Sequence, residues 1–317
     1  MQHRKLQHRK LQQTLWRIVF ILALLHVVMY VCLPCFVPWF WARLHRCTGV
    51  HHRWQGQPPT NVHGVALVVV LDDFLSPEMR MRTIENKRVY AEHWNFALVA
   101  PSVEEVRDSA GGFPTAWAKL QVAKTALESY RYVFVVDGDA VIMRLDIDLG
   151  LAIAELEEVG GSMLISKDFN GLNSGVFLLK STPWTFAFLA EAAKARALLG
   201  RKTRTMPLKY ENRAFFYLTG MWPECFGVRR PDALLAPTYN DTRKFRDGIH
   251  LVDLCLINRR PVHSTLLWDV LASDAGMDVS TGAFVMHVAG GTPQSKRAVL
   301  EILLEQSSVK TSNFQSI

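Results

Sequence analysis

Two short runs of apolar, mostly β-branched residues constrain the fold of this chain more than any other feature. They cover residues 64–71 and 132–136, and an acidic pair follows each of them. Continuous apolar runs are typical of strands that are covered on both faces, and hence of a mostly parallel sheet. Residues 77–94 and 115–130 carry helical patterns between these runs, so the alternation predicts βαβ units.

The remaining patterns extend this α/β domain. Residues 96–99 and 284–288 are expected to form further strands, and residues 183–199 and 295–304 to form further helices. Hydrophobic residues make up 49% of the chain, which is ample for a packed core. We therefore predict one α/β domain over residues 63–317, with a mostly parallel central sheet flanked by helices.

The first sixty residues differ in charge from the rest of the chain. They contain eight Lys or Arg residues and no Asp or Glu, so the remainder of a chain with net charge +7 lies near −1. The basic character therefore belongs to the N-terminal segment and not to the predicted domain. A nucleic-acid-binding domain needs basic residues on its own surface, so we expect no nucleic-acid partner.

Residues 18–37 form an apolar stretch about as long as a bilayer core requires. Basic residues precede it and an aromatic cluster follows it, which predicts a cytoplasmic N-terminus. A cleaved signal peptide is the alternative, but the stretch is long for one and no A-x-A-like site follows. We expect residues 1–17 to be a cytoplasmic tail, residues 18–41 a retained transmembrane signal-anchor, and residues 42–62 a stem.

Two further features depend on which side of a membrane the domain occupies. If the domain is lumenal, Cys225 could form a disulfide with Cys255, and two reduced buried thiols are the equal alternative. Asn240 begins the one N-x-S/T sequon of the chain, which is a weak indication of glycosylation.

Asp137 and Asp139 are the strongest candidates for chemistry. In open α/β sheets, ligands bind beyond the carboxyl ends of the strands, where this pair is expected to lie. Two crowded carboxylates repel each other, and a divalent cation relieves the repulsion while phosphate oxygens fill its other positions. Gly138 removes a side chain where a ligand would come close. The alternative is a solvated turn, because Asp and Gly are common turn residues.

His287 lies in a late apolar segment and precedes Gly290 and Gly291. Imidazole is an acceptable ligand for manganese beside two carboxylates. The glycines give backbone N–H groups room to approach an anion, and Lys296 and Arg297 follow a short distance further. A histidine that is simply hydrogen-bonded within the core is the alternative.

Two polar segments offer groups that could contact a sugar. Asn173, followed by Ser174, can donate and accept hydrogen bonds as sugar hydroxyls require; the alternative is an Asn/Gly turn before a strand. Glu211 opens a predicted helix and offers a carboxylate that could face a sugar. A solvated helix start explains Glu211 equally well.

Together these segments resemble the galactosyl/mannosyl/xylosyltransferase family that is grouped as glycosyltransferase family 34. The resemblance covers about residues 64 to 305, with five motifs in the family's order. They are residues 86–94, residues 117–119, the strand with Asp137-Gly138-Asp139, residues 172–179 and residues 284–291.

The resemblance implies a GT-A fold and a type II Golgi membrane enzyme whose catalytic domain is lumenal. It implies retaining transfer of a hexose or pentose (galactose, mannose or xylose) from a nucleotide-sugar donor to a hydroxyl of a glycan or glycoprotein acceptor. Asp137, Asp139 and His287 would hold Mn²⁺, or another divalent cation, on the diphosphate.

The resemblance also implies roles for the other candidate residues. The nucleotide-sugar would contact Asp137, Gly138, Asn173, Ser174, Gly290, Gly291 and Lys296. The catalytic set would be Asp139, Glu211 and Asn173.

Two departures from the family's pattern favour another class of protein. The family commonly has Gln after the acidic residue where this chain has Glu211-Asn212, and Thr292 and Pro293 separate the glycines from Lys296. A catalytically silent membrane-anchored subunit or glycan-binding protein is therefore the alternative.

A metal-dependent phosphohydrolase is a third hypothesis, but such an enzyme would need further ligands for a second metal ion. Homo- or hetero-oligomers with other glycosyltransferases stay open.

Overall fold

The structure is a computed structural model. It describes residues 19–22, 64–71, 75–168, 171–202, 210–221, 244–257, 283–288 and 293–314. The expected tail, stem and most of the expected anchor lie outside these ranges, as do Cys225 and Asn240. Among the described residues, no helix combines the length and the apolar character needed to cross a membrane.

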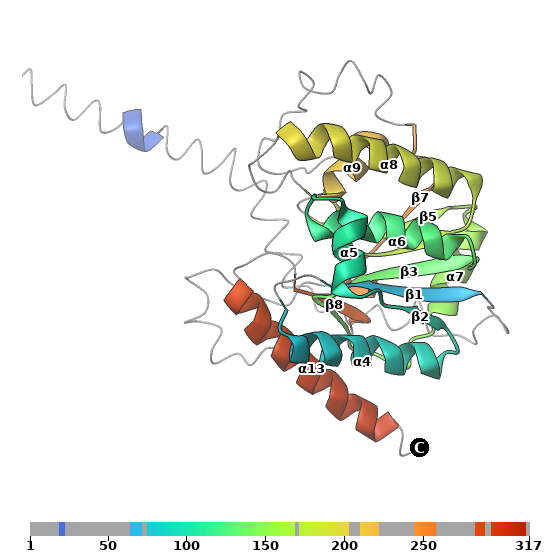
Figure 1. The fold of residues 1–317 in the computed structure, drawn as a ribbon, viewed down its shortest axis with the longest axis vertical. Helices are drawn as coiled ribbons and strands as arrows, with labels where there is room; N and C mark the ends of the chain where they lie inside the picture. The colour runs from blue at the N-terminus through green and yellow to red at the C-terminus, as the bar shows by residue number, and fades with distance from the viewer. Residues whose placement is uncertain are drawn as a thin grey trace, which may run out of the picture.

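Six of the described strands form one sheet, in the order β2-β1-β3-β6-β5-β7 (Figure 1). The strands are β1 (Val65–Val70), β2 (Ala97–Val99), β3 (Tyr132–Asp137), β5 (Met163–Asp168), β6 (Gly171–Lys180) and β7 (Ile249–Val252). β1 is parallel to β2 and β3, and β5 is parallel to β7. The α/β class is confirmed. The expected mostly parallel sheet is corrected to a mixed one, because β6 is antiparallel to both of its neighbours.

The direction of β6 follows from a hairpin that the apolar pattern did not reveal. β5 and β6 are consecutive strands that pair with each other in antiparallel direction, and their register shifts between Ile165 and Ser166. Residues 171–175, expected to form a polar segment before a strand, therefore lie inside strand β6. They carry Asn173 and Ser174 toward the end of β3.

Helices cover both faces of the sheet. One face packs against α4 (Pro77–His93), α7 (Leu149–Glu158), α11 (Leu254–Ile257) and α13 (Pro293–Phe314). The other packs against α5 (Val103–Ala110), α6 (Ala118–Leu127), α8 (Pro183–Lys202) and α9 (Asn212–Thr219). The helix expected over residues 115–130 divides into a 3₁₀ turn, η2 (Thr115–Trp117), and α6. Figure 1 shows α13 beside α4.

A second, two-stranded sheet lies on the α4 side of the molecule. β4 (Ala140–Ile142) pairs with β8 (Val285–His287) in antiparallel register, with Ala140 opposite His287. The pairing continues at both ends, since Val288 N donates to Asp139 O at 2.9 Å and Met143 N donates to Phe284 O at 2.8 Å. This small sheet therefore fixes the late strand beside the acidic segment.

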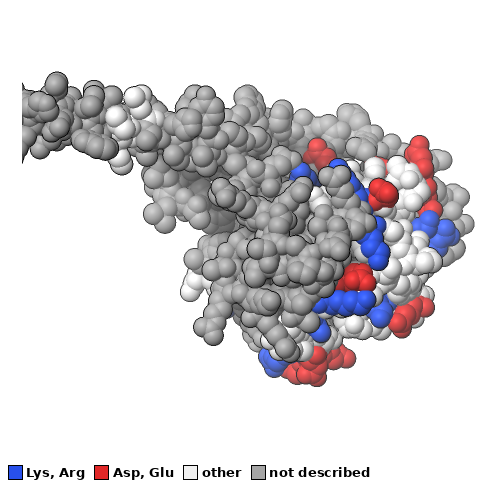
Figure 2. Space-filling view, turned by 90° about the horizontal axis from the view of Figure 1, so that it is seen from above, with Lys and Arg blue, Asp and Glu red and all other residues white. Residues whose placement is uncertain are grey.

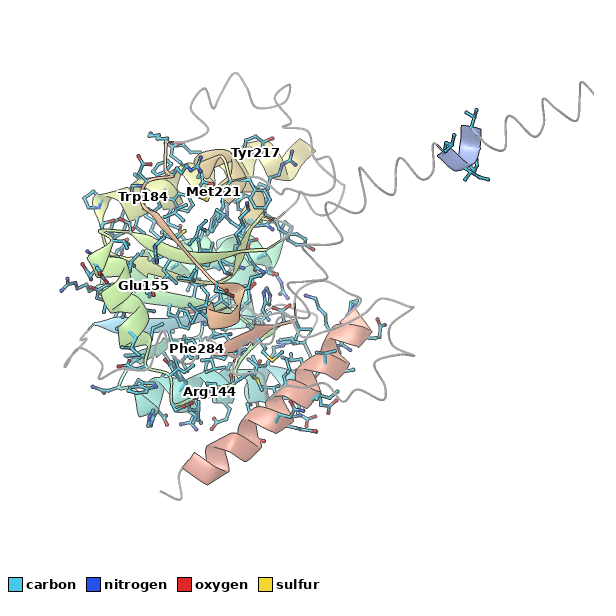
Figure 3. The ribbon with its side chains drawn as sticks, turned by 180° about the vertical axis from the view of Figure 1, so that it is seen from behind. Arg144, Glu155, Trp184, Tyr217, Met221 and Phe284 are labelled. Carbon is cyan, nitrogen blue, oxygen red and sulfur yellow. The ribbon has the colours of Figure 1, made fainter. Side chains whose placement is uncertain are left out.

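Aromatic packing attaches the small sheet to the large one. The ring of Phe284 stacks on Phe134 of β3 with a centroid distance of 6.0 Å, and Tyr90 of α4 meets it at 5.4 Å. Phe284 is fully buried. It lies on the opposite side of the sheet from Trp184 of α8 (Figure 3).

Phe284→Ala should lower the free energy of unfolding by about 3–5 kcal/mol, because it removes a buried ring that joins the two sheets. Urea denaturation followed by circular dichroism measures this. Met81→Ala is the control, since Met81 is exposed on α4 and its loss should cost less than about 0.5 kcal/mol. Equal costs for the two variants would contradict the role of Phe284.

Candidate metal and sugar site

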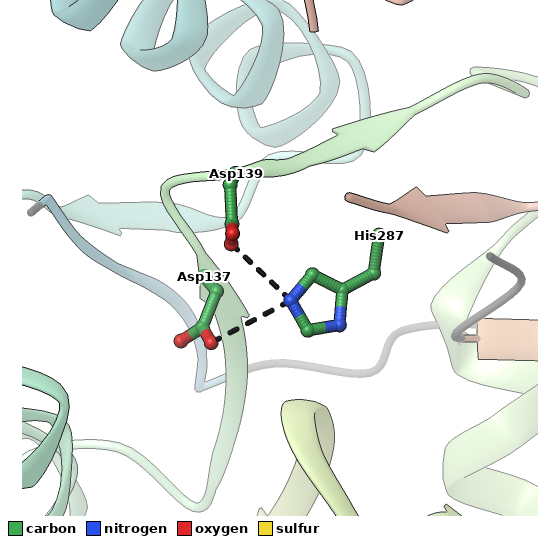
Figure 4. A group of neighbouring side chains, drawn as sticks. All are labelled: Asp137, Asp139 and His287. Carbon is green, nitrogen blue, oxygen red and sulfur yellow. Dashed lines mark ion pairs between the residues drawn. The ribbon is translucent and has the colours of Figure 1, made fainter. Parts of the chain in front are cut away.

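Asp137, Asp139 and His287 converge although β3 and β8 belong to different sheets. Nε2 of His287 lies 3.2 Å from Oδ1 of Asp139 and 3.9 Å from Oδ2 of Asp137 (Figure 4). One potential ligand atom from each residue lies within 4.8 Å of the other two. The expectation that the imidazole would lie beside the acidic pair is confirmed.

The end of strand β1 holds the acidic turn in place. Gly138 N donates to Val70 O at 3.1 Å, beside the last residue pair of β1 and β3, Val70 and Asp137. A Cβ at Gly138 would lie 3.1 Å from both Val70 O and a methyl carbon of Leu71. Glycine at this position is thus explained by close packing against β1.

Two lysines from distant helices pair with the two aspartates. Nζ of Lys119, on α6, lies 2.6 Å from Oδ1 of Asp137. Nζ of Lys296, on α13, lies 2.6 Å from Oδ2 of Asp139. Thr292 and Pro293 therefore do not prevent Lys296 from reaching the acidic turn.

These neighbours shift the pKa values of the two aspartates in opposite directions. Burial raises the pKa of Asp137 above its ordinary value, although Lys119 and His287 oppose the shift. Burial alone would raise the pKa of Asp139 too, but His287 and Lys296 together bring it well below its usual range. Asp139 is therefore held as a carboxylate, the form that binds a cation.

Glu211 lies at the same site, immediately before α9. Its Oε1 accepts from Ser174 Oγ at 2.8 Å and lies 2.8 Å from Nζ of Lys119. Its Oε2 is buried and has no hydrogen-bond partner among the described residues. A buried carboxylate oxygen without a donor is costly, so a ligand hydroxyl would be a favourable partner for it.

Asn173 and Ser174 lie between Glu211 and the acidic turn. Both are buried, and Asn173 Oδ1 accepts from Gly175 N at 3.0 Å. Ser174 O accepts from Lys119 Nζ at 3.1 Å. Lys119 thus joins β3, β6 and the start of α9 in one cluster. Burial would lower the pKa of Lys119, but Asp137 and Glu211 raise it, so the ammonium stays charged.

The donor set fits a divalent cation of the manganese type. Two carboxylates and one imidazole offer the oxygen and nitrogen ligands that such ions accept. Within the described ranges, these three residues form the group that could hold a metal ion. The roles of individual residues stay predictions, and Gly290 and Gly291 lie outside the described residues.

The sequence assigned no role to two lysines of this region, Lys119 on α6 and Lys87 on α4. Both are fully buried. Lys119 lies three residues after Ala116 and four before Ala123, on the apolar face of its helix. A lysine on an apolar helix face is unusual, because a buried ammonium needs partners. That signal could have found Lys119.

Surface charge adds no second candidate on the face that Figure 2 presents. On the described part of this face, acidic and basic side chains lie interspersed, without a continuous patch of one sign.

Comparison with known families supports a glycosyltransferase resemblance. Residues 69–160 match the galactosyl transferase GMA12/MNN10 family. The matched segment includes Asp137 and Asp139. An uncharacterized alpha-1,2-galactosyltransferase of Schizosaccharomyces pombe is 28% identical over 141 residues. The match covers 34% of this chain and 37% of that protein, so the chain spans about a third of its relative's length. The family resemblance expected from the motifs is confirmed for this part of the chain.

Solved structures show similarity at low sequence identity. A glycosyltransferase involved in the glycosylation of the major capsid of PBCV-1 is 11% identical, covers 75% of this chain and 99% of that one, and gives a TM-score of 0.44. The glycosyltransferase GlyE of Streptococcus pneumoniae TIGR4 is 12% identical, covers 81% and 64%, and gives the same TM-score, 0.44. Mouse xyloside xylosyltransferase 1 is 11% identical, covers 71% and 97%, and gives 0.37.

Gly175→Ala should destabilise the site through a specific clash. A Cβ at Gly175 would overlap the imidazole ring of His287, so the substitution should cost about 1–3 kcal/mol of unfolding free energy. In a His287→Ala background the same substitution should cost much less, because the ring is gone. Chemical denaturation of the four proteins measures this coupling.

Gly160→Ala is the matched control for that cycle. Gly160, unlike Gly175, has a positive φ of 64°, and a Cβ there meets nothing within 4 Å. Its cost should be the same with and without His287. An equal cost of Gly175→Ala in both backgrounds would contradict the close approach of β6 to His287.

Proposed function

We propose that this chain is a metal-dependent retaining glycosyltransferase that transfers galactose from a nucleotide-sugar to a hydroxyl of a glycan or glycoprotein. The observation that carries the proposal is the convergence of Asp137, Asp139 and His287 at the ends of strands from two sheets. Galactose is favoured over mannose and xylose by the names of the matching family and of the yeast relative.

Asp137, Asp139 and His287 would hold Mn²⁺, which when bound offsets the charge that grows on the departing diphosphate. The chain adds a cation of its own. Nζ of Lys296 is already at the edge of this cluster, and its side chain remains 20% exposed. From there the ammonium could turn from Asp139 to a phosphate oxygen. Gly290 and Gly291 are proposed to lie against the diphosphate.

Glu211 and Asn173 would face the reacting sugar. The partnerless Oε2 of Glu211 is suited to accept a hydrogen bond from a sugar hydroxyl, or to stabilise positive charge that develops at the anomeric carbon. Lys119 and Ser174 would orient Glu211 through its other oxygen. A retaining reaction would keep the anomeric configuration of the donor sugar in the product. The name of the yeast relative states an alpha linkage.

We further propose a single-pass type II location in the Golgi membrane, with residues 18–41 as the anchor and the catalytic domain in the lumen. The support is the apolar stretch and the charge distribution of the first sixty residues. Lumenal exposure would give the domain access to glycan acceptors.

The purified full chain should transfer galactose from its nucleotide diphosphate in the presence of Mn²⁺, and a chelator should abolish the transfer. Mass spectrometry of acceptor products detects it, and NMR of the anomeric proton tests retention. Asp139→Asn and His287→Ala should each lower kcat at least about a hundredfold, with unchanged circular dichroism. Full activity of both variants would disprove the metal site.

Glu211→Gln should lower kcat by roughly a hundredfold, because it removes a charge that faces the reacting sugar. Steady-state kinetics with the galactose donor measures this. Glu157→Gln is the matched control, since Glu157 is a carboxylate paired with Lys180 at 2.6 Å at the other end of β3 and β6. If both variants keep full activity, Glu211 has no part in the reaction.

A catalytically silent subunit or glycan-binding protein is the second candidate, favoured by the Glu211-Asn212 departure. Calorimetric titration with UDP and GDP, with and without Mn²⁺, separates the two candidates. An enzyme of the proposed kind should bind a nucleotide more tightly when the metal is present. An inactive scaffold should show no metal-linked binding.

A further inference from the structure

Helix α4 donates hydrogen bonds to three alternate carbonyls of the acidic segment. Thr83 Oγ1 donates to Gly138 O at 2.9 Å, and Lys87 Nζ donates to Ala140 O. Asn86 Nδ2 donates to Ile142 O at 3.0 Å. These contacts join residues more than fifty positions apart in the chain.

The opposite edge of the same segment pairs with strand β8. Asp139 O and Met143 N bond to the backbone at Val288 and Phe284. In an extended strand, successive backbone groups point to alternate sides. The carbonyls of residues 138, 140 and 142 therefore point away from β8, and α4 supplies the partners that another strand would have supplied.

Asn86 reproduces the pairing of a strand most closely. Its Oδ1 accepts from Ile142 N at 2.9 Å while its Nδ2 donates to Ile142 O. One amide side chain thus satisfies both backbone groups of a single residue, as a neighbouring strand does.

The donors occupy one face of α4, and that face is polar although it is buried. Thr83 and Lys87 are four residues apart and fully buried, and Lys87 Nζ also lies 3.3 Å from Thr83 Oγ1. Burying an ammonium is costly unless it is hydrogen-bonded, and burial lowers the pKa of Lys87 to about 7. An apolar face would hold the helix on the sheet at less cost. The polar row is therefore explained by the carbonyls of residues 138, 140 and 142 that it satisfies.

We propose that Thr83, Asn86 and Lys87 are positioning residues that fix the main chain on both sides of Asp139, so that its carboxylate meets Asp137 and His287 at ion-binding distance. Asp139 lies between the two carbonyls held by Thr83 and Lys87. Ala140 is opposite His287 in the small sheet. The same contacts therefore also fix the position of the imidazole relative to the two aspartates. The inference rests on the proposed function, because it presumes that Asp137, Asp139 and His287 bind a divalent cation.

Mn²⁺ affinity of the purified full chain, measured by calorimetry without any sugar donor, tests the inference. Thr83→Val keeps the shape of the side chain but removes the donor, and should weaken binding about tenfold or more, as loss of partners behind metal ligands does. Thr83→Ser restores the hydroxyl and should bind Mn²⁺ like the wild type. Asn86→Leu should weaken binding as well, and provides a second variant if Thr83→Val folds poorly.

Tyr90→Phe is the matched control on the same helix. The Tyr90 hydroxyl donates to Ile147 O at 2.9 Å and accepts from Leu149 N at 3.2 Å, so its loss affects stability outside residues 138–142. The variant should melt at a lower temperature and keep wild-type Mn²⁺ affinity. Equal Mn²⁺ affinity for Thr83→Val, Asn86→Leu and the wild type would overturn the inference while leaving the proposed function intact. A wild-type chain that binds no Mn²⁺ would overturn the metal site itself, and the inference with it.

Discussion

The crowding of three carboxylates at one end of the sheet is the constraint on which the rest of the site depends. Glu211 converges on Asp137 and Asp139 from a distant part of the chain, and Lys119 and Lys296 pair with these carboxylates. Without positive charges nearby, three ionised carboxylates at this distance would repel one another. The two lysines offset this repulsion, and they leave one buried oxygen of Glu211 without a hydrogen-bond partner among the described residues.

The two sheets divide the work of building this site. The large sheet brings the ends of β1, β3 and β6 together, and its ladders are extensive. The small sheet has three residue pairs and depends on α4 and on Phe284 for its position. The large sheet thus holds Asp137 at the end of β3, whereas the small sheet holds His287 beside the acidic turn. Substitutions in the large sheet should therefore mainly change the free energy of unfolding, whereas those in the small sheet should also change the distance between His287 and the aspartates.

The sequence predicted the elements that have strong local patterns, and it predicted the meeting of Asp137, Asp139 and His287. Apolar runs located β1 and β3, but such a run does not encode strand direction, so the antiparallel direction of β6 was missed. The importance of Gly175 depends on a ring far away in sequence. Lys87 was missed because one of its partners is a main-chain carbonyl of a distant element, Ala140 O, which no local pattern records. Tertiary contacts, and not propensity, decided each of these cases.

The partners of Asp139 come very late in the order in which a ribosome makes this chain, since Lys296 follows it by 157 positions. While the chain is being synthesised, β1, β3 and β6 can pair and α4 can dock long before residue 287 exists. During that interval the acidic turn has no imidazole beside it. A nascent domain would therefore hold most of its framework early, and the proposed ion site would be completed only when β8 pairs with β4.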